Sequence, residues 1–149
     1  MNFEKINQIL KKFEINFSEN SLPVYLDQNG NKIDLEQIFT LESIENKPVS
    51  IIAVTRNQYD TNNFEKFVKY INDELKIQRH YFGLWPDTEK NKIEYDVSYV
   101  IPTNDFSEVQ KHLNLHNHLN NEPQSMALVI FPDGNYDIIR NQSQKSKLD

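Results

Sequence analysis

Two histidines four residues apart carry the most specific chemical spacing in this chain of 149 residues. His112 and His116 lie in a predicted helix, where positions i and i+4 share one face. Zinc sites use such a pair together with a carboxylate, which Asp87 or Asp105 could supply. The chain lacks the H-E-x-x-H motif and a second ligand pair, so the alternative is two histidines at the edge of a core. On balance we expect no metal and no cofactor.

Three carboxylates surround a predicted β-hairpin. Paired carboxylates can perform acid–base chemistry or hold magnesium. Glu94 and Asp96 alternate with apolar residues, so we expect both on an exposed, acidic strand face, and Asp87 in the turn. Both places favour these residues for local structural reasons. The carboxylates are therefore weak candidates for catalysis.

Composition excludes several other chemistries. The chain has no cysteine, which excludes disulfides and thiolate metal sites. Its three glycines cannot form a P-loop or a dinucleotide-binding loop. Ser98 lies outside a G-x-S-x-G elbow. A catalytic role is thus less favoured than a binding role.

The elements that must position these residues follow from local patterns. Apolar spacing predicts amphipathic helices, and Asp34, Asn62 and Asp105 are candidate N-caps. Asn29-Gly30 predicts a hairpin turn. Short β-branched or alternating runs predict strands. The predicted helices span 3–13, 35–39, 64–75 and a segment after 105, and the predicted strands span 22–26, 32–33, 49–55, 78–85, 93–100, 126–131 and 136–139.

From residue 49 to residue 131 the expected order is β-α-β-β-α-β. That order is typical of a ferredoxin-like core, an antiparallel sheet with two helices on one face. We therefore expect an α+β fold in which residues 49–140 form this core. Residues 1–48 would form an N-terminal helix and hairpin extension that covers the sheet. Residues 141–149 read as a polar tail.

The net charge of the chain limits the classes of binding partner that we expect. A formal charge of −6 argues against broad binding to nucleic acid, which needs clustered lysine and arginine. A small stacking patch of Arg79, Tyr81 and Trp85 keeps single-stranded nucleic acid as an alternative. No apolar run reaches the ~20 residues that cross a bilayer, and no signal peptide is evident. We expect a cytoplasmic protein.

The hairpin also carries a resemblance. Gly83-Leu84-Trp85-Pro86-Asp87 and Tyr95-Asp96-Val97-Ser98-Tyr99-Val100 are similar to the pattern G-x-W-x-D followed by Y-x-D-V-S-x-V. Residues 124–129 match its third part, N-Q-x-A-I-F-D, loosely, and the turn at 88–91 departs from it in having no glycine. The pattern resembles a small uncharacterised domain of bacteriophages and their hosts. That resemblance implies a phage or mobile-element setting, with the host cytoplasm as compartment, and carries no catalytic residues.

The expected function is a non-enzymatic accessory protein that binds a protein partner, which could be a second copy of the chain. The hairpin surface would form the interface, because Trp, Tyr and Arg are the residues most often found at binding hot spots. The alternatives are a metal-dependent enzyme or hydrolase at His112 and His116, and a single-strand nucleic-acid-binding module. The expected binding residues are Arg79, Tyr81, Trp85, Asp87, Glu94 and Asp96.

Overall fold

A computed structural model of the chain describes residues 2–15, 23–55, 61–87, 92–116, 124 and 126–142. Within it the chain forms two compact units, each built from two segments. The first unit contains residues 1–33 and 55–98, and the second contains residues 34–54 and 99–149. The domain division predicted from the sequence, at residues 48 and 140, stays a prediction.

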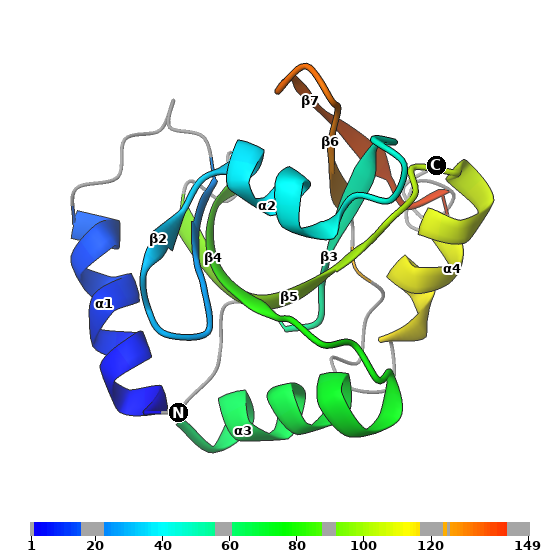
Figure 1. Cartoon of the computed structure of the whole chain (residues 1–149). Coiled ribbons are helices and arrows are strands. Elements are labelled where there is room, and N and C mark those ends of the chain that lie inside the picture. Colours follow the sequence, from blue (N-terminus) through cyan, green and yellow to red (C-terminus); the bar gives the residue numbers. More distant parts are fainter. Residues whose placement is uncertain are drawn as a thin grey trace. The chain divides into compact units, whose positions relative to one another are not determined.

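The first unit combines two helices with four strands (Figure 1). Its strands lie in the order β2-β1-β4-β5, and each neighbouring pair is antiparallel. Phe64 stacks on Phe3 at 6.3 Å and meets Phe82 edge-on at 5.5 Å, which joins both helices to the sheet. The elements are α1 (Phe3–Ile15), β1 (Val24–Leu26), β2 (Lys32–Ile33), α3 (Thr61–Lys69), η1 (Tyr70–Glu74), β4 (Tyr81–Asp87) and β5 (Lys92–Ile101), whose last three residues belong to the second unit.

The turn between β1 and β2 confirms the Asn-Gly prediction. Gly30 has φ +85°, and an added Cβ would meet Ile6 and Ile9 of α1 at 3.1 and 3.2 Å. The carboxylate of Asp27 accepts hydrogen bonds from the backbone N–H groups of Asn29 and Asn31, each at 2.9 Å. Only glycine combines this backbone conformation with such close helix packing.

Helix α3 continues into a π-helical turn. The Leu75 N–H reaches the Tyr70 carbonyl at 3.1 Å, and Lys76 then ends the helix in the left-handed region with φ +57°. The predicted helix over 64–75 is confirmed up to Glu74, where η1 ends. Its start is not, because α3 begins at Thr61 and Asn62 lies inside it rather than at the N-cap.

The second unit holds two helices and three further strands. Helix α2 (Leu35–Glu42) begins at Asp34, whose side chain accepts the Gln37 N–H in a capping box. Strands β3 (Val49–Ala53), β6 (Met126–Ile130) and β7 (Tyr136–Arg140) lie in the order β3-β6-β7 with antiparallel pairing. Helix α4 (Phe106–Leu115) is capped by Asp105, which accepts the Glu108 N–H at 3.1 Å.

The ferredoxin-like prediction is wrong. The described residues contain the expected seven strands and four α-helices, but strands predicted to lie outside the four-stranded core pair with the strands of that core. The N-terminal hairpin, predicted to cover a sheet face, instead extends the sheet, because β1 pairs with β4 from Val24↔Leu84 to Leu26↔Phe82. Strand β7 likewise pairs with β6 along its full length. A strand edge with unpaired N–H and C=O groups accepts any suitable strand, and no local pattern shows which one.

Candidate functional site

Three adjacent strands of the first unit bring polar and aromatic side chains together at Gly83. Tyr25 on β1 and Asp96 on β5 are both direct cross-strand partners of Gly83 on β4. A Cβ on Gly83 would lie 2.8 Å from Oδ1 of Asp96, 2.9 Å from Cε1 of Tyr25 and 3.2 Å from Nε1 of Trp85. The missing side chain therefore allows these three groups to meet over the backbone.

Asp96 is buried, which corrects the predicted acidic strand face. Only 4% of Asp96 is exposed and none of Ser98, although Glu94 is half-buried. Burial raises the pKa of the Asp96 carboxyl to about 7, and the charge of Glu94 acts in the same direction. The Ser98 hydroxyl opposes that rise by donating to Oδ1 at 2.6 Å. Near neutral pH this carboxyl is a mixture of protonated and charged forms.

Trp85 and Tyr25 form the aromatic part of this cluster. Their rings meet edge-on at 6.0 Å with an interplanar angle of 87°. Neither the Tyr25 hydroxyl nor the Trp85 indole N–H meets a hydrogen-bond partner among the described residues. The indole N–H favours the charged form of Asp96 weakly, but without hydrogen-bond geometry. Buried donors of this kind usually find a partner.

The other predicted binding residues differ in how much of each side chain is exposed to solvent. Arg79 is exposed and Trp85 is half-buried, so both offer surface to a partner. Tyr81 is 1% exposed and offers none, like Asp96. Asp87 ends β4 opposite Lys92, rather than lying in the turn, and its side chain lies outside the described residues.

The predicted histidine pair meets a tyrosine that sequence reasoning missed. The Tyr99 hydroxyl on β5 lies 2.6 Å from Nδ1 of His112 and 2.9 Å from Nε2 of His116. Tyr99 and His116 are fully buried, and His112 is half-buried. Both histidines thus face Tyr99, although α4 ends at Leu115 and His116 is its C-cap rather than a residue of the helix. Only the alternation of β5 hinted at Tyr99, and alternation does not reveal which helix lies above a strand.

The chemistry of this second cluster follows from its protons. Burial lowers the pKa of His112, while the charge of Glu108 raises it and that of Lys111 lowers it. Burial therefore favours the neutral form of the His112 imidazole at pH 7. The one Tyr99 proton can serve only one of the two nitrogen contacts, so one imidazole accepts from the hydroxyl and the other donates to it.

Of the two proposed carboxylate ligands, only Asp105 has a side chain among the described residues. Asp105 is engaged as the N-cap of α4. Asp87 belongs to the other unit. Within the described ranges no group of three or more His, Cys, Asp or Glu side chains could hold a metal ion. The cluster that the structure brings together consists of two histidines and a tyrosine.

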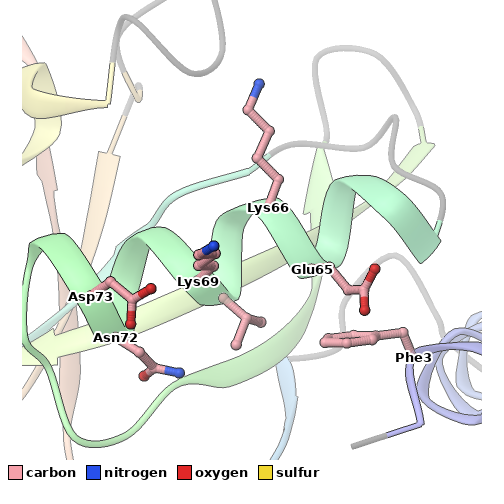
Figure 2. Close-up of a pocket in the computed structure, with 7 residues that line it drawn as sticks. Phe3, Glu65, Lys66, Lys69, Asn72 and Asp73 are labelled. Carbon is pink, nitrogen blue, oxygen red and sulfur yellow. The ribbon is translucent and has the colours of Figure 1, made fainter.

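A surface hollow of about 630 Å³ lies along α3 in the first unit (Figure 2). Phe3 of α1 and Val68 form its apolar part, and exposed acids and lysines surround them. Because both acidic and basic side chains line the exposed edge of this hollow, it favours neither anionic nor cationic ligands. The remaining lining residues are Glu65, Lys66, Lys69, Asn72 and Asp73.

Among the helices of the described residues, none combines the length and the hydropathy of a membrane span. Comparison of the chain with family models, curated proteins and solved structures finds no match in any of the three.

Proposed function

We propose that this chain is a non-enzymatic accessory protein that binds a protein partner through the surface of the β4–β5 hairpin. The single observation that supports it most is the state of Trp85. Its ring is held edge-on against Tyr25, and the residue is half-buried, so part of the side chain faces solvent. A positioned aromatic side chain that is partly exposed is typical of an interface anchor.

Arg79 extends this surface. It lies two residues before β4 and is exposed. Tyr81 and Asp96 support the surface from beneath rather than contact the partner, since both are buried. The resemblance of the hairpin to phage and host domains favours a phage or mobile-element origin, and with it the host cytoplasm.

The test is affinity capture followed by titration. Partners of the tagged wild-type protein, including a second copy of the chain, are identified, and the affinity of each purified partner is then measured. Trp85→Ala should weaken the interaction by about 30-fold, equivalent to about 2 kcal/mol at a hot spot. Trp85 emission should shift to the blue on binding. Phe106→Ala, an exposed aromatic of the other unit, is the matched control and should bind normally.

Two outcomes would contradict this proposal. In one, a genuine partner binds the Trp85→Ala protein as tightly as wild type. In the other, the emission is already blue-shifted in a verified monomer and does not change with partner, which would make Trp85 a core residue.

A further inference from the structure

Tyr99, His112 and His116 bring one phenol oxygen and two imidazole nitrogens together in the second unit. We propose that these three side chains bind one divalent first-row transition-metal ion, Zn²⁺ or Cu²⁺. The inference is independent of the proposed hairpin interface, because all three residues belong to the second unit.

The first support is convergence. Nδ1 of His112 and Nε2 of His116 both lie within 2.9 Å of one atom, the Tyr99 oxygen. The Tyr99 oxygen is thus the point on which two imidazole nitrogens converge. Imidazole ligands suit both ions, and copper binds a given nitrogen and oxygen site more tightly than zinc does.

The second support is the size of the rearrangement required. Metal–nitrogen bonds of about 2.0–2.1 Å place tetrahedral donor atoms about 3.3 Å apart. The present separations are 2.6 and 2.9 Å, so the donors must move apart by roughly half an ångström. His112 is half-buried and can supply the movement that its own contact needs. The side chains of Tyr99 and His116 are fully buried, and their donor atoms must separate by about 0.4 Å through small rotations.

The third support is the balance of protons. The imidazole that now donates to Tyr99 must move its proton to the nitrogen that faces away from the metal, and the other imidazole already carries its proton there. Tyr99 must lose its phenolic proton to become a ligand. Binding therefore releases one proton to solvent and leaves a site of net charge +1, near the carboxylate of Glu108, which acts electrostatically on His112. Three protein ligands leave a fourth position on the half-exposed side for water or another ligand.

The experiment is calorimetric titration of the full chain with Zn²⁺ and with Cu²⁺, each in two buffers of different ionisation enthalpy. The expected result is one ion per chain with release of one proton. His112→Ala should weaken binding by about 100-fold, at least as much as losing an outer-shell partner costs. Tyr99→Phe should abolish proton release and remove the visible phenolate-to-copper charge-transfer band. Lys111→Arg, which keeps the positive charge of an exposed residue on the same helix, is the matched control and should bind like wild type.

Both variants should still fold, because His112→Ala changes only a half-buried side chain and Tyr99→Phe keeps the buried ring. Circular dichroism verifies that they are folded. The proposal is overturned if the wild-type chain binds neither ion when the ion is present at about 0.1 mM. A site that fills only at about millimolar metal would be too weak to be specific. It is also overturned if His112→Ala and wild type bind equally tightly, because the ion would then lie elsewhere.

Discussion

Gly83 and Asp96 are direct partners on neighbouring strands, and a Cβ on Gly83 would lie 2.8 Å from the carboxylate oxygen of Asp96. The glycine is therefore needed for the neighbouring side chains and not for an unusual backbone conformation. A buried carboxyl, a buried phenol and an indole all occupy the space that a side chain on Gly83 would fill.

Replacing Gly83 should destabilise the protein. The added methyl group of Gly83→Ala would also lie 2.9 Å from the Tyr25 ring, so at least one neighbour must move. Overpacking of this kind costs about 1–3 kcal/mol. Urea denaturation measures the loss. The same substitution in an Asp96→Ala background should cost less, and an equal cost in both backgrounds would show that the two residues are not in steric competition.

Removing the charge of Asp96 should stabilise the protein at high pH. The pKa of this carboxyl is about 7 in the folded protein and 3.8 in an unperturbed one, so the folded state binds more protons between these values. Stability contributed by the carboxyl is therefore full below about pH 4 and is lost as pH rises through about 7. The loss is of the order of 4 kcal/mol. Asp96→Asn should be more stable than wild type at pH 8 and differ little at pH 4.

Unfolding free energies from urea titrations at both pH values test this expectation, with the exposed Glu65→Gln as control. Asp96→Asn keeps an oxygen that can accept the Ser98 hydroxyl. A variant that is less stable than wild type at pH 8 would mean that the charged carboxylate is stabilising in the folded protein.

His80 should produce the opposite pH dependence. Burial lowers its pKa from 6.5 to about 4, so the unfolded state binds more protons in that range. Stability is full above about pH 6.5 and is lost as pH falls towards 4. In wild type this trend opposes that of Asp96. In Asp96→Asn only the His80 contribution remains, so the free energy of unfolding should rise from pH 4 to 6.5. In His80→Asn only the Asp96 contribution remains, so the free energy of unfolding should fall over the same range.

The two single variants and the double variant, measured at several pH values, separate these contributions. The Gln28 amide lies 3.3 Å from Nδ1 of His80, and an asparagine oxygen can replace that acceptor. Parallel pH curves for wild type and His80→Asn would contradict the assignment.

The capping box of α2 should carry measurable stability. Asp34 accepts the Gln37 N–H and Gln37 accepts the Asp34 N–H, both at 2.9 Å. Asp34→Ala leaves the Gln37 N–H without its partner and should cost about 1 kcal/mol. Thermal denaturation measures the shift, and Glu45→Ala, an exposed acid beyond the helix end, should cause almost none. Equal shifts for both would indicate a general charge effect.

Asn141 should be important for the second unit. Its buried amide donates to the Gln124 carbonyl at 2.8 Å and to the Asn114 side chain at 3.0 Å, which links β7, α4 and the start of β6. Asn141→Ala leaves a buried carbonyl unsatisfied and should cost about 1–3 kcal/mol. The neighbouring Gln142→Ala keeps its backbone bond to Gln110 and should be nearly neutral in the same denaturation assay.

Most secondary structure could be predicted from the sequence, because its causes lie within a few residues. Asp34 and Asp105 cap helices, Gly30 allows a turn, and the apolar spacing at residues 64–75 defines one helix face. The pairing of β1 with β4 and of β6 with β7 could not be predicted, since strand edges carry no local label. That pairing is what makes the ferredoxin-like arrangement wrong.

The sequence by itself determined the helices, the strands and the i, i+4 spacing of His112 and His116. Only the tertiary structure decided that Asp96 is buried and that Tyr99 meets both histidines. The physical reason is that burial and convergence depend on residues distant in the chain. Tyr25 lies 71 positions before Asp96, and no periodicity within β5 reports what packs against it.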